Sequence, residues 1–349
     1  MAPSPARQLH PRHGTHQPTR GTPARRPSSA RRTSTVDMLR PDGLVGPDGR
    51  VGDVVVDARA RDLRTGPDGE AEARDETRVT AEIDYAGGWT LKSLASEPVE
   101  PRLAGLIGAS AGGGFRRRVQ ADLPDQYAAA TRLHLLLDDF PVATLVSGYS
   151  LGAGGIHPDP EALVGMARAD LCSGWRSGGT IMVSIQRERT IPIVTGPEAP
   201  GLESPAPMAS EEVLENGSDA DAWHDRPPLS PHAMRRARRL DVWLADGVIE
   251  LDSLFRDSHV DADGLETVIH EYTVRGQVDP EDFTIRALVA TPQVLPWVEC
   301  PSAVASAGRL IGQDVRTLRP LVRAGFKGIS TCTHLNDQLR ELADLPALL

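Results

Sequence analysis

Apolar and polar residues alternate in two stretches of the C-terminal third of the chain. Residues 240–244 alternate up to Asp246 and Gly247, and an apolar run resumes directly after them. Alternation with a period of two is typical of a strand with one buried face, and Asp-Gly between two such runs indicates a tight hairpin. Residues 268–274 and 283–289 repeat this pattern around an Asp-Pro-Glu-Asp turn. The sequence therefore predicts an antiparallel sheet here.

The spacing of apolar residues changes after Cys300. From Val304 to Ile311 they recur as on one face of a helix, which should end near Gly312. Residues 318–322 and 335–342 continue this pattern as a second and a third helix. A sheet followed by helices predicts an α+β fold.

The same order of features occurs twice along the chain. The matching segments, first copy before second, are 57–62 and 252–257, 67–69 and 262–264, 89–94 and 283–288, and 106–108 and 310–312. A self-match at nearly constant distance indicates an internal duplication. We therefore expect two related modules, each an antiparallel sheet followed by helices, packed face to face and joined by a connector that contains a hairpin.

This repeat divides the chain into four segments. We expect a flexible Arg- and Pro-rich arm over residues 1–30, a degenerate first module over 31–141, a connector over 142–226 and a second module over 227–349. The first module is the poorer copy, because it has an insertion around Pro47-Asp48-Gly49 and three consecutive glycines where a helix should run.

The connector is the part that is not repeated. Residues 181–186 and 190–195 alternate around turn residues, which predicts its hairpin, and the acidic run over residues 211–221 is expected to be a solvated loop.

Composition narrows the class of protein. The chain has 349 residues and a formal net charge of -10, which argues against a nucleic-acid-binding surface over its body. No apolar run approaches the roughly 20 residues of a membrane span, and no signal peptide is recognisable. We expect a soluble, cytoplasmic protein. The use of arginine in place of nearly all lysine is typical of a GC-rich genome.

Three cysteines, Cys172, Cys300 and Cys332, are too few for a disulfide framework. Cys300 and Cys332 stand where helices are predicted to begin, and a helix N-terminus favours the thiolate. With His334 and His270 they would provide two sulfurs and two imidazoles, a donor set for zinc or an iron–sulfur species.

Two other interpretations of these cysteines remain. Cysteine is often simply a core residue. Cys332 would alternatively be a nucleophile with His334 or His270 as its base. Cys172 has no histidine or predicted helix start near it. The repeated Asp-x-x-x-Arg-Asp motif occurs in both copies, one of which has no thiol, so we expect a structural role in ion pairs.

Several short segments together resemble one bacterial family. The segments on which the resemblance rests are Arg61-Asp62-Leu63, residues 137–141 (Leu-Asp-Asp-Phe-Pro), residues 234–236 (Met-Arg-Arg) and residues 332–335 (Cys-Thr-His-Leu). Through these segments the chain resembles, over most of its length, the family known as domain of unknown function 2889. That resemblance implies no activity, substrate or cofactor.

The C-terminal module is also similar, more remotely, to the iron–sulfur cluster assembly scaffold fold. Residues 300–306 (Cys-Pro-Ser-Ala-Val-Ala-Ser) follow a hairpin, and Cys332 opens a terminal helix. This resemblance implies that both thiols bind zinc or a cluster, and it aligns the family's liganding aspartate with His270. The family's histidine falls on Thr331, whereas His334 lies two residues after Cys332.

These observations favour a bacterial binding or accessory protein whose C-terminal module holds zinc or an iron–sulfur species through Cys300, Cys332, His334 and His270. A thiol-dependent enzyme acting on a small acyl or carbonyl substrate is the alternative from another class. A structural partner protein without any site is the third.

Overall fold

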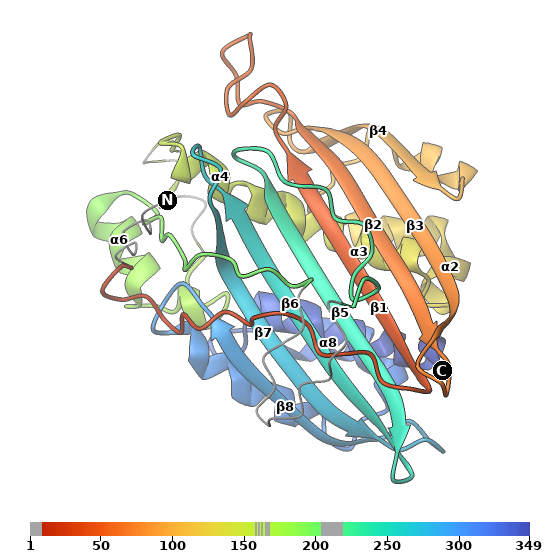
Figure 1. Ribbon diagram of the computed structural model, residues 1–349. Helices are drawn as coiled ribbons and strands as arrows, with labels where there is room; N and C mark the ends of the chain where they lie inside the picture. Colours follow the sequence, from red (N-terminus) through yellow and green to blue (C-terminus); the bar gives the residue numbers. More distant parts are fainter. Residues whose placement is uncertain (1–8, 158, 160, 162, 165–167, 204–218) are drawn as a thin grey trace, which may run out of the picture.

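The centre of the molecule is one antiparallel sheet of eight strands. The computed structural model describes residues 9–157, 159, 161, 163–164, 168–203 and 219–349. The strand order is β4-β3-β2-β1-β5-β6-β7-β8 (Figure 1). The strands are β1 (Ser29–Leu39), β2 (Val54–Thr65), β3 (Ala71–Asp84), β4 (Thr90–Glu97), β5 (Met234–Ala245), β6 (Val248–Val260), β7 (Glu266–Val278) and β8 (Ile285–Val294).

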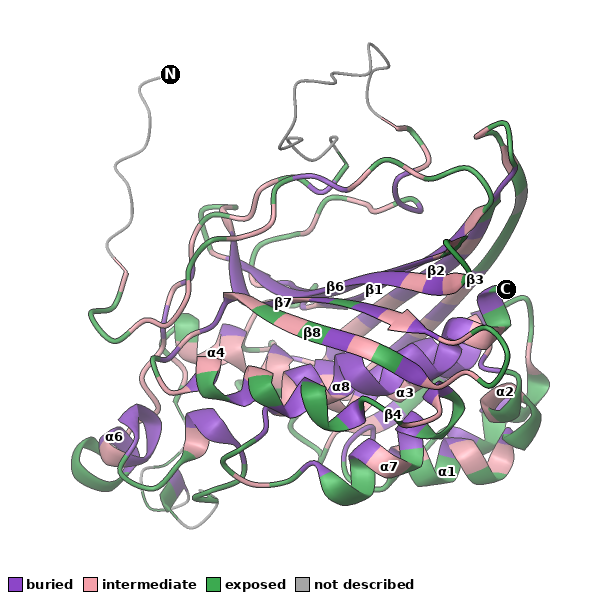
Figure 2. Cartoon of the chain, turned by 90° about the horizontal axis from the view of Figure 1, so that it is seen from below, coloured by how far each residue is buried: buried purple, intermediate pink, exposed green. Residues whose placement is uncertain are grey.

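Helices follow each group of four strands and cover one face of the sheet (Figure 2). The α-helices are α1 (Phe115–Asp122), α2 (Pro124–Ala128), α3 (Arg132–Ser147), α4 (Tyr149–Ala153), α6 (Thr180–Glu188), α7 (Leu318–Gly325) and α8 (Thr333–Glu341). The 3₁₀ helices are η1 (Pro101–Leu106), η2 (Ser173–Trp175), η3 (Cys300–Leu310), η4 (Val315–Thr317) and η5 (Leu342–Leu348). The expected α+β layout, a large antiparallel sheet with helices, is confirmed. Within the described residues, no helix combines the length and apolar character needed to cross a bilayer.

The two halves of the chain meet edge to edge. β1 pairs with β5 in antiparallel register, with Thr33 opposite Arg239. The expectation of two sheets packed face to face is therefore wrong. The first strand of each half has an open edge, and its backbone N–H and C=O groups are satisfied when the two edges pair.

Local geometry recurs at matched positions of the two halves. Trp89 and Phe283, each just before the fourth strand of its half, have φ values of 62° and 63°. Gly108 and Gly312 have φ values of 84° and 82°, and each donates its backbone N–H to the start of that fourth strand. The halves differ most in the first hairpin, where the loop over residues 40–53 replaces a turn of Asp246 and Gly247.

Extended segments cross the face of the sheet opposite the helices (Figure 2). Residues 9–28, which we expected to belong to a flexible arm, instead lie against β7 and the connector. The Thr19 N–H donates to Glu271, and the indole of Trp223 donates to Thr22 at 2.8 Å. Both ring nitrogens of His224 lie 2.9 Å from hydroxyls of β1, those of Thr33 and Thr35. Residues 1–8 lie outside the described part.

The connector contains a helix where a hairpin was expected. Residues 180–188 form α6, and residues 191–195 have no regular structure. Ile181, Met182 and Ile185 are buried, which is the i, i+1, i+4 spacing of one helix face. The hairpin prediction was wrong because a run this short fits both periods. Most of the expected acidic loop, residues 211–218, lies outside the described residues.

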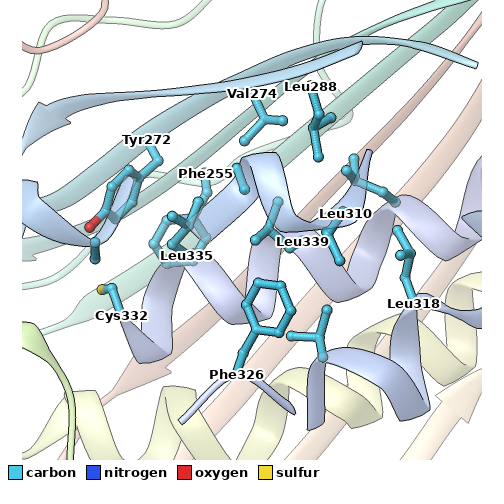
Figure 3. Packing of buried hydrophobic residues seen from close by; sticks show 14 of the residues in the cluster. Phe255, Tyr272, Val274, Leu288, Leu310, Leu318, Phe326, Cys332, Leu335 and Leu339 are labelled. Atoms are coloured by element: carbon cyan, nitrogen blue, oxygen red, sulfur yellow. The ribbon is translucent and has the colours of Figure 1, made fainter. Parts of the chain in front are cut away.

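Two apolar cores lie between the sheet and the helices, one under each half. Figure 3 shows part of the second core, in which Leu335 and Leu339 of α8 pack towards Phe255 and Tyr272 of the sheet. Burial of such side chains contributes about 1.5–3 kcal/mol each relative to leaving them exposed.

A layer of buried charges separates the two cores. Arg238 of β5 donates to both Asp139 oxygens of α3, at 2.7 and 2.5 Å, and to Glu341 of α8 at 3.0 Å. Arg32 of β1 donates to Asp344 of η5 at 2.7 Å. Each central strand therefore binds a carboxylate from the helices of the other half.

Replacement of Arg238 by Met should destabilise the protein by about 3–5 kcal/mol, because Asp139 and Glu341 would remain buried without their cation. Urea denaturation followed by circular dichroism measures the loss. The matched control is Arg286→Met, which removes an exposed partner of Asp279 and should cost about 0–1 kcal/mol. Equal losses in the two variants would contradict the assignment of Arg238 as a link between the halves.

His224 should make the protein less stable in acid. Burial, followed by the charges of Arg61 and Arg235, lowers the pKa of His224 from 6.5 to about 3. The unfolded chain therefore takes up the proton first, and stability is lost as pH falls from about 6.5 towards 3, by up to about tenfold in the unfolding constant per pH unit. His224→Gln should flatten the pH dependence of the unfolding free energy between pH 7 and 5, whereas an unchanged slope would refute this role.

Candidate functional site

Three polar side chains form a row across the second half of the sheet. Arg236 of β5 lies opposite Asp257 of β6, and Asp257 lies opposite His270 of β7. All three side chains point to the helical face, where they meet the start of α8. The row is interrupted after Asp257 by a bulge in the β6–β7 register, which changes the pairing of the next residues.

His334 reaches the row from the first turn of α8. The helix lies over the sheet because Leu335 and Leu339 are fully buried against it. Its Gln338 side chain donates to the hydroxyl of Ser253 at 3.0 Å and fixes the helix along β6. These contacts place the His334 ring against that of His270, with centroids 3.6 Å apart and an interplanar angle of 19°.

Both histidines direct a ring nitrogen at the same carboxylate oxygen. Asp257 Oδ2 lies 3.5 Å from Nδ1 of His270 and 3.7 Å from Nε2 of His334. Neither nitrogen has a hydrogen-bond partner. The three donor atoms all lie within 4.8 Å of one another, and within the described residues this is the one group of three or more such side chains. The histidine side chains keep 14% and 16% exposure, but the two nitrogens that face Asp257 are buried.

The charge states in this cluster are fixed by burial and by Arg236. Burial alone would raise the pKa of Asp257, but the Arg236 guanidinium and His270 hold it well below its usual range. Arg236 donates to the two Asp257 oxygens at 2.9 and 3.1 Å. Burial and then His270 lower the pKa of His334 well below its ordinary value, so this imidazole is neutral at pH 7. A neutral imidazole has one nitrogen with a free lone pair.

This donor set fits a transition-metal ion. Two imidazole nitrogens and one carboxylate oxygen are ligands of zinc and of non-haem iron. In a tetrahedral zinc site with bonds near 2.1 Å, neighbouring donors are about 3.4 Å apart, close to the separations from Asp257. A cation between the three atoms would satisfy the two nitrogens that have no partner.

The four residues expected to form a metal site separate into two groups. His270 and His334 come together with Asp257. Cys332 lies on the other side of the His334 ring, with its sulfur 3.9 Å from Nδ1. Cys300 begins η3, and its sulfur joins no group of three mutually close ligand atoms among the described residues.

The expectation of thiolates at these helix starts is wrong. Cys332 is the N-cap residue of α8 as expected, but burial raises the pKa of its thiol to about 11. Burial likewise raises the pKa of Cys300 well above its usual value. Loss of solvation outweighs the helix N-terminus in both cases. Cys332, His334 and Asp257 lie in the order of a nucleophile, base and orienting carboxylate, but the thiol is protonated.

The matching position in the first half is occupied by a salt bridge. Asp62 of β2 is held by Arg32 of β1, at 2.6 and 2.7 Å, as Asp257 is held by Arg236. The first turn of α3 then supplies Arg132, which donates to Asp62 Oδ2 at 2.7 Å. In the second half, the imidazoles of His270 and His334 take the place of this second cation.

Asp257 is the site residue that sequence reasoning assigned to a structural role. Its neighbours in the repeated motif do form ion pairs, since Arg256 binds Glu271 and Arg61 lies 3.9 Å from Asp221. Asp257 differs because the β6–β7 register brings His270 opposite it. The signal in the sequence that could have identified Asp257 is that the second copy of the motif lies near histidines.

The fold and the site together define an α+β protein with a two-histidine, one-carboxylate cluster in its C-terminal half. Residues 234–347, from β5 to η5, match the family described as Protein of unknown function (DUF2889). The expected resemblance is confirmed over this segment. No curated protein and no solved structure matches the chain, so the resemblance to the iron–sulfur scaffold is not confirmed.

Cys332 should be unreactive in the native protein. With a thiol pKa of about 11, iodoacetamide at pH 7.5 should modify it at least about 100-fold more slowly than a free cysteine. Quenched samples analysed by peptide mass spectrometry give the rate, and the unfolded chain serves as the reference. A native rate as fast as the unfolded one would restore Cys332 as a candidate nucleophile.

Proposed function

We propose that this protein is a binding or accessory protein that holds a divalent transition-metal ion through Asp257, His270 and His334. The observation that carries the proposal is the pair of histidine nitrogens that face Asp257 Oδ2 without hydrogen-bond partners. Buried polar atoms are normally satisfied, and an unsatisfied one costs about 1–3 kcal/mol. A metal ion satisfies both nitrogens at once.

The first half supports the choice of a cation. Asp62 binds two guanidinium groups, those of Arg32 and Arg132, whereas Asp257 binds the single guanidinium of Arg236. A divalent ion beside His334 would stand where Arg132 stands in the other half. The second half has no counterpart of Arg132, and a divalent ion would supply the positive charge that Arg132 supplies in the first half.

Zinc suits these ligands better than an iron–sulfur species. Iron–sulfur clusters are held mainly by cysteine thiolates, and both cysteines of the second half lie outside the triad. Three protein ligands leave a fourth position on zinc for an outside group. This is the position through which an accessory protein would bind a small ligand or a side chain of a partner.

We also infer that the two halves descend from one duplicated module. The inference rests on three observations: the spacing of 194–195 residues between the first three pairs of matched segments, the shared positive φ angles, and the antiparallel β1–β5 pairing about which the halves are arranged. If the module was duplicated, the first copy kept the ion pairs of Asp62 with Arg32 and Arg132, while the second copy acquired His270 and His334 beside Asp257.

Zinc should stabilise the protein through the triad. We expect an increase in unfolding free energy of about 2.7 kcal/mol at a free zinc concentration 100 times the dissociation constant. His270→Ala and His334→Ala should abolish the increase. The measurement is thermal or urea unfolding with and without zinc, supported by metal analysis of tag-free protein in which His10, His13 and His16 are replaced by Gln.

Two further variants sharpen this test. His232→Ala, which removes a histidine outside the triad, is the matched control and should keep the zinc effect. His334→Arg should fold, because it recreates the second guanidinium of the first half, and should bind no zinc. Zinc stabilisation that survives loss of both triad histidines would refute the site.

A further inference from the structure

All three cysteines of the chain converge on one place, although they come from segments far apart in sequence. Ser173, next to Cys172, donates its N–H to the carbonyl of Thr331 at 2.9 Å, and its hydroxyl donates to the carbonyl of Glu299. Thr331 precedes Cys332 and Glu299 precedes Cys300. One connector residue thus joins the neighbours of the other two thiols.

The connector backbone at Gly174 packs closely against the sulfur of Cys300. A Cβ atom on Gly174 would lie 2.9 Å from the sulfur of Cys300, so no larger residue fits without a shift. Cys172, Cys300 and Cys332 are 7%, 7% and 5% exposed. Cys300 and Cys332 belong to the apolar core of the second half.

Backbone N–H groups of α8 face two of these sulfurs. The N–H of Thr333 is directed at Cys172, and those of His334 and Leu335 are directed at Cys332. Free N–H groups at a helix N-terminus stabilise negative charge on sulfur.

A second observation points to a ligand at the same place. The Tyr272 side chain is fully buried and its hydroxyl lies beside Cys332 (Figure 3), close enough for the two to interact. Even so, no hydrogen bond of ordinary geometry satisfies this hydroxyl. A buried phenol is normally hydrogen-bonded.

We propose that Cys172 and Cys332, with Cys300 beside them, bind the soft monovalent cation Cu(I) at the N-terminus of α8. Thiolate ligands select Cu(I) over harder ions. The three sulfurs do not all lie within 4.8 Å of one another in the described structure, so they do not form the compact ligand set that zinc requires. Cu(I) is satisfied by two sulfurs.

The binding step is a ligand exchange without electron transfer. The two S–H bonds break, two protons leave to solvent, and two S–Cu bonds form. The product has one net negative charge, which the N–H groups of residues 333–335 stabilise. The ligand atoms of this site differ from those of the proposed zinc triad.

The test is an anaerobic titration of tag-free protein, with His10, His13 and His16 replaced by Gln, with Cu(I) supplied as its acetonitrile complex. Bathocuproine disulfonate competes for the ion and reports the affinity. We expect about one equivalent to bind, at least about 100-fold more weakly in Cys172→Ser and Cys332→Ser. His232→Ala, which leaves the three thiols and the zinc triad intact, should bind Cu(I) as the parent does.

X-ray absorption of the loaded parent protein provides a readout that needs no folded cysteine variant. Scattering from sulfur as the main neighbour of copper is the expected result. Scattering mainly from nitrogen, complete transfer of Cu(I) to the chelator, or equal binding by the variant that lacks all three thiols would each overturn the proposal. Near-UV circular dichroism verifies that each variant is folded.

Discussion

The fold depends on arginines that are buried on the two central strands. Because β1 and β5 are covered on both faces, a guanidinium on either strand must find its carboxylate inside the protein. Across the seam, Arg31 binds Asp241 and Arg235 binds Asp37, which is the same pair in two-fold repetition. On the helical face, Arg238 joins α3 to α8. The halves therefore cannot separate without leaving charges unpaired in the interior.

The candidate zinc site depends on this seam. Arg236 holds Asp257 in place, and the same guanidinium lies 3.4 Å from Asp139 of α3 and 3.2 Å from Asp337 of α8. The carboxylate oxygen that faces the two histidines is thus positioned by the first half as well as by the second. Any functional account of residues 234–347 has to include the helix supplied by residues 132–147.

Much of the sheet could be predicted because its information is local. The Asp246-Gly247 turn and the alternation on either side of it specify a hairpin, and the apolar spacing after residue 318 specifies helices. Register is not local. Asp257 meets His270 only through a bulge between β6 and β7, so the third ligand of the triad was not recognised. Burial is not local either, and it turned the expected thiolate at Cys332 into a protonated thiol.

His334 connects the two proposed metal sites through its ring. Its Nε2 faces Asp257 and its Nδ1 faces the sulfur of Cys332, so the two nitrogens serve different neighbours. If Nε2 uses its lone pair for zinc, the proton of the neutral imidazole must be on Nδ1, where it points at sulfur. A thiolate is the better acceptor for that proton, and thiolate is also the form that binds Cu(I). One tautomer of one histidine therefore suits both sites, although they use different ligand atoms and select different ions.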